Sequence, residues 1–482
     1  MEEEAKAKWG YDEKAPKLKS VIDKINITDP LEKYAYMFSS EMGWHYRNLD
    51  GKPNVELQNA IKSVFASGGA KALLSFTEQI DNADLLGWES GYIDFAQEDI
   101  IAILKYGDTN NEKIISFESA FFTSVVNFRG KEYLDNIYDT SWSDGYKKIL
   151  LCSIRKGRDY WNWLNEKGLA DLYWKNVQSI YISSDEDYEF AMQKLRQTDN
   201  YVPMFHLIIT QKYGSHGDKI KTDDIIFVLK GALEKQDVIR DVISSNHLPD
   251  LFKLLQDRVE IDVEWDVLFQ LELAYFPLFD DYCGLQPIAI EHRLRTDPEF
   301  FLEIIQAIFT KKEDLINKTK EEKQQAENAA HLALKLYMKM DKMYPFQDEE
   351  NLNNWMNRAD ILIGRISDDN IRRCAKQKIG SMLSANTLVD KDDDVWPVKY
   401  VRNIIEKFYD KDLREGFVIG KFNSLGVRTV DTKNPEKYWI DKAAKYKKDA
   451  DKIRFSYPYT AQILDSMAED YRREAERAKI EF

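Results

Sequence analysis

Histidine and cysteine, the side chains that most often bind transition metals or act as nucleophiles, are few and scattered in this sequence. No two histidines stand four residues apart, no HExxH motif occurs, and the three cysteines lack CxxC spacing. A zinc site or a cysteine–histidine pair would therefore need residues from distant parts of the chain. We expect no metal site and no cysteine nucleophile. The residues concerned are His45, His206, His216, His247, His292 and His331, with Cys152, Cys283 and Cys374.

Motifs that bind phosphates or activate a serine are also missing from the sequence. It contains no GxxxxGK[ST] loop, no GxGxxG after a strand and no GxSxG elbow. We therefore expect no cofactor, no catalytic residue and no enzyme activity. One alternative stays open, namely an enzyme whose site is assembled from distant residues, for example Asp280 and Asp281 with a histidine.

The acidic run Asp392–Asp394 could suggest a site for a divalent cation. It lacks the alternating ligands and the glycine of an EF-hand loop. Carboxylates favour helix N-termini, so we expect Asp394 or a neighbour to cap a helix that begins near Trp396 and Pro397. Trp396 stands at the start of an amphipathic run, and we expect its ring to be buried.

Lysine and aromatic residues are concentrated in the segment 433–454. Basic side chains and stacking rings together can bind single-stranded nucleic acid or phosphate groups. Four acidic residues halve the net charge of this segment, which favours an ordinary solvated helix with its rings turned inward. Its candidate partner-binding residues are Trp439, Lys442, Lys445 and Lys448.

Tryptophan and tyrosine also cluster at 160–163 and 173–174. Their spacing places alternate rings toward the core and toward the rim of the protein. Core packing is the ordinary role of such rings, whereas rim aromatics favour recognition. Trp161, Trp163 and Trp174 are therefore further candidate partner-binding residues.

Apolar residues recur at three- and four-residue spacing, which predicts helices throughout. The run 222–234 forms one apolar face, 263–279 is apolar nearly all round, and 299–309 is a broad apolar stripe. Hydrophobic residues make up 44% of the chain and aromatic residues 13%, enough for a sizeable core, while only 21 Gly and 12 Pro interrupt it. About twenty helical segments with short connectors are expected.

The predicted fold class is all-α, an irregular helical-hairpin solenoid of the HEAT or TPR kind. No signature recurs at 33 or 34 residues, so an irregular α-helical globule is the alternative. The expected divisions are an N-terminal tail, 1–29, and two helical arrays, 30–258 and 259–482. Two segments are expected not to be helical. Residues 212–221 form a polar loop, and the Gly-spaced segment 416–432 is extended or a long loop.

Helix boundaries are predicted from capping residues and glycines. Asp29-Pro30, Asp297-Pro298 and Asn434-Pro435 each place a capping side chain before a proline at the first helical position. Expected stop signals are Gly43, Gly107, Gly364 and Gly380.

Charge and hydropathy bear on partners and location. Lysine and arginine number 68 against 83 acidic residues, a net charge of −15, which disfavours nucleic acid and anionic membranes. The start Met1-Glu2-Glu3-Glu4 has the wrong charge for a signal peptide, and no apolar stretch is long enough to span a bilayer. With widely separated cysteines, this predicts a soluble cytoplasmic protein.

Several stretches of the chain share motifs with a known group of proteins. They are Leu273–Leu278, His292–Leu294, Asp297–Phe301, Asp394–Pro397 with Val401-Arg402, Gly416–Val427 and Asp171–Val177. These stretches resemble the C-terminal helical region of large bacterial anti-phage defence proteins, which carry an N-terminal nucleotide-processing or effector module. The resemblance implies that this chain is the sensing or scaffolding arm, without the effector, and it assigns no functional residues.

Together these observations predict a non-catalytic helical-repeat recognition or scaffold module. We expect its partner to be a protein, either further domains of a larger protein or a phage protein, and nucleic acid to be unlikely. A nucleic-acid-binding solenoid that uses 433–454 remains the second alternative.

Overall fold

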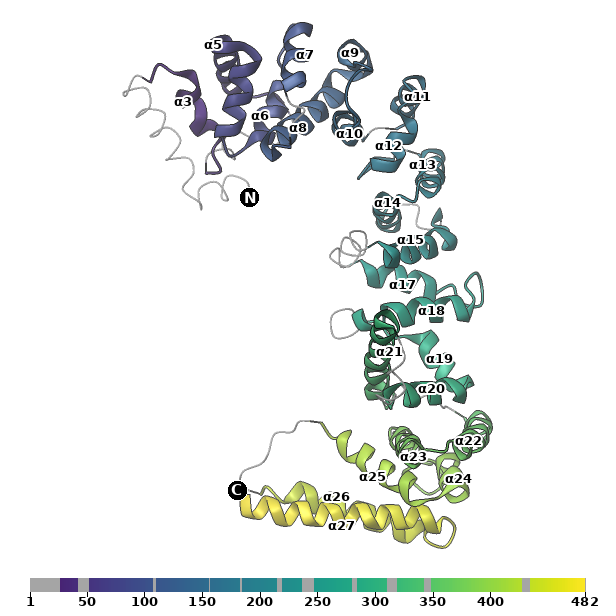
Figure 1. Cartoon of the computed structure of the whole chain (residues 1–482). Coiled ribbons are helices and arrows are strands. Elements are labelled where there is room, and N and C mark those ends of the chain that lie inside the picture. Colours follow the sequence, from purple (N-terminus) through teal and green to yellow (C-terminus); the bar gives the residue numbers. More distant parts are fainter. Residues whose placement is uncertain are drawn as a thin grey trace. The chain divides into compact units, whose positions relative to one another are not determined.

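The computed structural model describes residues 27–41, 52–106, 110–155, 157–182, 184–214, 219–235, 247–279, 284–309, 319–341, 348–426 and 434–481. In these ranges every regular element is a helix and no strand occurs, apart from one isolated bridge between Val259 and Val263 (Figure 1). The all-α prediction is confirmed. No helix of these ranges is apolar over a length that would cross a membrane.

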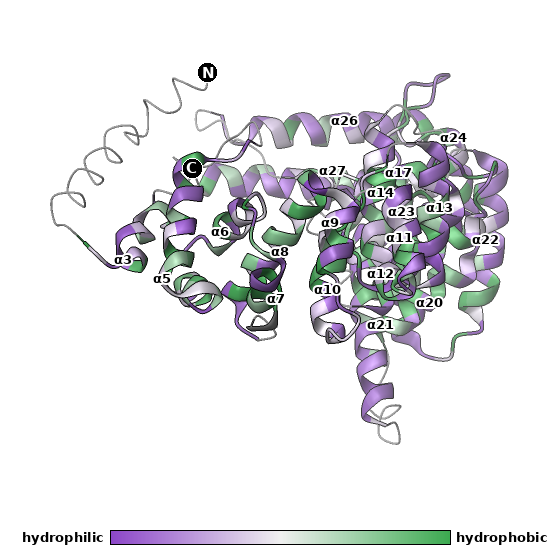
Figure 2. Ribbon diagram, turned by 90° about the horizontal axis from the view of Figure 1, so that it is seen from above, coloured by the Kyte–Doolittle hydropathy of each residue, from purple (hydrophilic) through white to green (hydrophobic). Residues whose placement is uncertain are grey.

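The chain forms two compact units, Met1–His247 and Leu248–Phe482. This division precedes the boundary predicted between residues 258 and 259. Within each unit, helices pack mainly on helices one to three places away along the chain. Figure 2 shows hydrophobic and hydrophilic residues alternating along the helices, as expected where each helix buries one side.

The described part of the first unit contains the 3-10 helix η1 and a series of α-helices. The elements are α3 (Pro30–Tyr34), η1 (Ala35–Phe38), α5 (Val55–Gln79), α6 (Ala83–Ser90), α7 (Gln97–Tyr106), α8 (Glu112–Phe128), α9 (Gly130–Ile137), α10 (Asp144–Ser153), α11 (Arg158–Glu166), α12 (Ala170–Asn176), α13 (Asp185–Gln197), α14 (Tyr201–Tyr213) and α15 (Thr222–Glu234).

The second unit is built in the same way. Its elements are α17 (Leu248–Gln256), α18 (Trp265–Tyr275), η3 (Phe276–Leu278), α19 (Ile288–Thr296), α20 (Pro298–Ile308), α21 (Lys320–Lys339), α22 (Glu349–Gly364), α23 (Asp369–Ser384), α24 (Lys399–Phe408), α25 (Lys411–Asn423), α26 (Lys437–Ile453) and α27 (Pro458–Glu481).

Two of the three predicted Asx–Pro starts are confirmed. The side chain of Asp29 accepts the Leu31 amide at 3.0 Å, and that of Asp297 accepts the Glu299 amide at 3.1 Å. The third is wrong, because α26 begins only at Lys437 and its N-cap is Glu436. Asn434 contributes its carbonyl oxygen there, to the Lys437 amide at 3.2 Å.

The prediction that the segment 416–432 is extended or a long loop is wrong for 416–423, which belong to α25. Gly416 and Gly420 stand four residues apart, on the side of α25 that crosses α23. A Cβ on Gly416 would lie 1.8 Å from the Gln377 carbonyl oxygen, and one on Gly420 would lie 2.4 Å from Ser381 Oγ. These glycines permit a close helix crossing. Residues 427–432 lie outside the ranges described.

Gly380 serves the same crossing from the other helix. It was expected to end a helix but lies inside α23, where a Cβ would meet the Leu413 carbonyl oxygen at 2.1 Å. Gly364, by contrast, is the last residue of α22, as predicted. The other two expected stops, Gly43 and Gly107, fall outside the described part of the chain.

The first unit contains two copies of one arrangement, in which an arginine binds an aspartate in the first turn of a later helix and lies over a phenylalanine ring of that helix. We call this arrangement the arginine clamp. At α13, Arg158 Nε donates to Asp187 Oδ1 at 3.0 Å and its guanidinium lies 4.4 Å from the Phe190 ring centroid. The guanidinium also donates to the carbonyl oxygen of Glu186 at 3.3 Å. The clamp thus ties the N-terminus of α11 to the first turn of α13.

The second copy of the arginine clamp lies at α15. Arg196 donates to Asp224 Oδ1 and to the Asp223 carbonyl oxygen, both at 3.1 Å, and lies 4.6 Å from the Phe227 ring centroid. Asp224 and Phe227 each stand 37 positions after their counterparts in α13. In the second unit, Arg293 of α19 contacts Asp266 and Phe269 of α18 similarly.

Two buried charged groups join helices of the second unit. Glu272 of α18 is fully buried and caps α19, accepting the Ala289 and Ile290 amides at 2.8 and 3.1 Å. Burial raises the pKa of Glu272 to about 7 despite these bonds. Lys378 of α23 is 4% exposed and pairs with Asp341 at 2.9 Å, just after α21.

Candidate functional site

The three tryptophans singled out in the first unit lie in its core. Trp161, Trp163 and Trp174 are 1, 2 and 3% exposed. Trp161 packs against Trp174 with ring centroids 5.2 Å apart, and Trp163 Nε1 donates to Asp135 Oδ1 at 2.9 Å. Their burial agrees with core packing, the ordinary role of such rings, and counts against these three as partner-binding candidates. Large rings next to one another in sequence fill the space between α11 and α12 and their neighbours.

The remaining four candidates lie on α26, which carries most of the segment 433–454. Trp439 and Lys442 are half-buried, whereas Lys445 and Lys448 are exposed. Of the other rings, Tyr446 is buried, as expected for a solvated helix that turns aromatics inward. Lys448 lines an open groove of about 680 Å³ between α26 and α27, away from the aromatic contacts described below.

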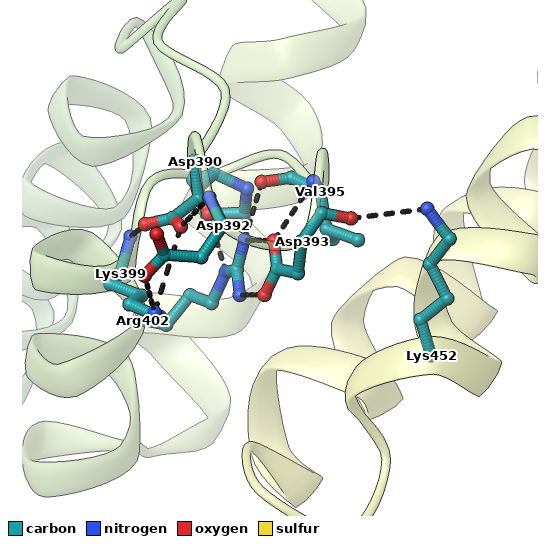
Figure 3. Close-up of polar contacts among 8 residues, drawn as sticks. Asp390, Asp392, Asp393, Val395, Lys399, Arg402 and Lys452 are labelled. Atoms are coloured by element: carbon teal, nitrogen blue, oxygen red, sulfur yellow. Dashed lines mark hydrogen bonds and ion pairs between the residues drawn. The ribbon is translucent and has the colours of Figure 1, made fainter.

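The acidic run next to this helix is used for ion pairs (Figure 3). Arg402 is fully buried, and its guanidinium donates to Asp393 Oδ2 at 2.5 Å and Oδ1 at 3.0 Å. It also donates to the carbonyl oxygens of Pro397, at 2.5 Å, and Val395. The Arg402 guanidinium holds the pKa of Asp393 below its usual range.

The predicted cap for the following helix is corrected by the same network. Helix α24 begins at Lys399, whose amide donates to Asp390 Oδ2 at 3.0 Å. The carboxylate at the helix N-terminus is therefore that of Asp390, which precedes the acidic run 392–394 in the chain. Asp392 instead pairs with the Lys399 ammonium group. Lys452 of α26 donates to the Asp393 carbonyl oxygen at 3.1 Å, which attaches this loop to α26.

Trp396 is buried, as predicted, and connects the network to α25 and α26. Its ring is 5% exposed, and Nε1 donates to the Asn386 carbonyl oxygen at 2.6 Å. Ring centroids of Phe417 and Tyr446 lie 5.4 and 6.0 Å from its own, and Lys421 Nζ lies 4.1 Å from it.

From Tyr446 a stack of rings runs outward to the surface. Tyr446 and Tyr471 have centroids 5.5 Å apart, Tyr471 and Trp439 5.7 Å, and Trp439 and Phe422 6.1 Å. The angles between successive planes are 13°, 23° and 6°. Tyr471 is 1% exposed but Phe422 is 41% exposed, so a rigid core stack ends in an accessible ring.

We call Ile419, Phe422 and Trp439 the aromatic surface. Ile419 is 55% exposed, and with Phe422 it lines a pocket of about 290 Å³ between α25 and α27. The polar rim of the pocket is made of ion pairs, Arg477 with Glu474 at 2.7 Å and Arg473 with Asp470 at 3.5 Å. Such a site can hold an apolar side chain between charges of both signs.

Sequence reasoning identified Trp439 but missed Ile419 and Phe422. Both fall in the segment predicted to be extended or a long loop, where a helical spacing is not expected. The signal was available, because residues three apart share one face of a helix, next to the four-residue spacing of Gly416 and Gly420.

In the described ranges, no three histidine, cysteine or acidic side chains come together in a way that could hold a metal ion. Asp280 and Asp281, named for the enzyme alternative, lie outside these ranges, as do His45, His216 and Cys283.

Comparison of the chain with protein families, with curated proteins and with solved structures gives no match.

Proposed function

We propose that this chain is a non-catalytic recognition module, an irregular array of helical hairpins that binds a protein partner through the aromatic surface. The observation that carries the proposal is the ring stack that runs from buried Tyr446 and Tyr471 to the exposed ring of Phe422. Aromatic residues held by a packed core are effective anchors, because little side-chain entropy is lost when they bind.

The partner that fits best is a protein segment presenting one large apolar side chain between charged residues of both signs. The pocket of about 290 Å³ has room for such a side chain. Its rim of paired arginines and carboxylates offers complementary contacts to flanking charges rather than attraction for a polyanion.

The array-like architecture is supported by local features rather than by a strict repeat. The aspartate and phenylalanine of the arginine clamp recur at a 37-residue offset in the first unit and its arginine at a 38-residue offset, and helices pack mainly on near neighbours along the chain. Stacked hairpins of this kind present extended surfaces for recognition. The resemblance to anti-phage proteins supports a role as the sensing arm of such a protein in the bacterial cytoplasm.

A photo-crosslinking amino acid at Ile419 would identify the partner in infected and uninfected bacterial extracts. Affinity for the purified partner would then be measured by calorimetry for the wild type, Phe422→Ala and Phe455→Ala. Phe455, 99% exposed, is a matched control. We expect Phe422→Ala to weaken binding about tenfold or more, a loss of about 1.4 kcal/mol, and Phe455→Ala to leave it unchanged.

Equal effects of the two substitutions would refute the assignment of the aromatic surface. Binding of nucleic acid that falls steeply with salt, with no crosslinked protein, would instead favour the nucleic-acid alternative. Turnover of a nucleotide by the purified chain would favour the enzyme alternative.

A further inference from the structure

The open groove between α26 and α27, of about 680 Å³, is lined almost entirely by charged side chains, and we call it the basic groove. Its lining holds four cations and one carboxylate. None of these residues lines the pocket of the aromatic surface, so the two surfaces are separate. The lining residues are Ala444, Lys447, Lys448, Asp451 and Lys452 from α26 and Arg472 from α27.

Two of the four cations have carboxylate partners. Lys447 Nζ lies 2.9 Å from Asp465 and 3.3 Å from Asp451. Arg472 lies 3.3 Å from Glu469 on its own helix, and both of these side chains are more than half exposed. An exposed pair within one helix contributes little stability, so Arg472 can turn to another carboxylate at small cost.

The other two cations, Lys448 and Lys452, form no ion pair with any residue of the described ranges. Lys452 donates to the Asp393 carbonyl oxygen at 3.1 Å, which is a dipole rather than a counter-charge (Figure 3). The carboxyl group of Asp449 acts on both lysines electrostatically. However, Asp449 is 4% exposed and belongs to the buried side of α26, so its carboxyl group does not line the basic groove.

Helical spacing brings these two lysines together on one wall of the basic groove. Lys448 and Lys452 stand four positions apart, which places their Cβ atoms about 5–6 Å from each other, and like charges at this spacing repel. Such a pair is notable in a chain whose 83 acidic residues outnumber its 68 basic ones. An anionic group bound between the two lysines would relieve the repulsion. Ala444, one turn before Lys448, leaves space for the backbone of a ligand.

We propose that the basic groove binds a short acidic peptide segment of a partner protein, whose carboxylates contact Lys448, Lys452 and Arg472. From Ala444 to Lys452, α26 rises about 12 Å. This length matches about three or four residues of extended chain. A nucleic-acid strand fits less well, because no aromatic ring lines the groove to stack on bases and the Asp451 carboxylate would repel phosphates. The proposal does not depend on the aromatic surface.

The probe is a fluorescein-labelled peptide of alternating glutamate and glycine, titrated with the full chain at low ionic strength and followed by fluorescence anisotropy. Saturable binding is expected, and the same peptide with glutamine in place of glutamate should not bind. Lys448→Glu should weaken binding about tenfold, because it removes an attraction, adds a repulsion and supplies Lys452 with a carboxylate. The matched control is Lys437→Glu, which makes the same change in net charge at an exposed position of α26 outside the groove.

Thermal melting of each variant checks that the fold is intact, and Arg472→Gln replaces Lys448→Glu if the latter unfolds. Phe422→Ala should bind the acidic peptide as the wild type does, which separates this site from the aromatic surface. Three results would overturn the proposal. They are the absence of saturation, equal weakening by Lys448→Glu and Lys437→Glu, and a single-stranded oligonucleotide of equal charge that binds more tightly than the peptide and is weakened by Lys448→Glu.

Discussion

Replacing Gly416 with alanine would place a methyl carbon 1.8 Å from the Gln377 carbonyl oxygen and 2.5 Å from its carbonyl carbon. Both are backbone atoms of α23, so no side chain can turn aside, and the two helices must move apart. Overpacking of this kind costs about 1–3 kcal/mol, occasionally more. Alanine regains about 0.5–1 kcal/mol by its higher helix propensity. Because the clash is severe, we expect a net loss of about 2 kcal/mol.

The control is Gly364→Ala at the end of α22, where nothing lies within 4 Å of the new Cβ. There only the propensity gain remains, and stability should stay equal or rise by up to about 1 kcal/mol. Differential scanning calorimetry measures both variants. For a unit of about this size, 2 kcal/mol corresponds to a fall in melting temperature of roughly 4–8 °C. A Gly416→Ala protein that melts at or above the wild-type temperature would refute the close crossing.

Three further predictions concern buried charges. The free energy of unfolding should fall as pH rises from about 4.5 to 7, because the unfolded chain loses the Glu272 proton at lower pH than the folded chain does. In urea titrations at stepped pH, Glu272→Gln should remove about 3 kcal/mol of this pH dependence. Parallel curves of stability against pH for the wild type and the variant would contradict the prediction. Asp341→Asn leaves the Lys378 ammonium group buried without its counter-charge and should lower the free energy of unfolding by up to about 3 kcal/mol. In thermal unfolding, this loss should be larger than the loss caused by Lys378→Met, which removes the buried charge itself. Arg402→Met should lower the free energy of unfolding, measured in urea, by about 3–5 kcal/mol, because it leaves Asp393 without its ion pair and two carbonyl oxygens without their donor. A loss below about 1 kcal/mol would contradict the importance of this network.

The helices were predictable where apolar spacing and polar flanks agree. The run predicted at 222–234 corresponds to α15, Thr222–Glu234. The prediction failed at α25, because glycines that serve a helix crossing look the same in sequence as glycines that break a helix. Only the facing backbone of α23 distinguishes the two, and that neighbour lies more than thirty residues away in the chain.

The candidate site was predictable only in part, for a related reason. Trp439 and the nearby lysines attract notice through local composition. Ile419 and Phe422 become a surface only when α27 packs beside α25 and leaves the pocket open. Around Trp161, composition indicates an aromatic cluster but does not show which face of the helix the Trp161 ring occupies. In the structure the Trp161 ring lies in the core.

The glycine crossing of α23 and α25 also bears on how a partner would be bound. Helices whose backbones meet directly have little freedom to slide or rotate, because any shift brings main-chain atoms together. Ile419 and Phe422 are therefore presented by a pre-organised helix whose position does not depend on long, flexible side chains. Most of the conformational entropy lost on binding at this surface would then be that of the partner, so a partner that is itself rigid would bind most tightly. Gly416→Ala would then weaken partner binding without touching any residue of the interface.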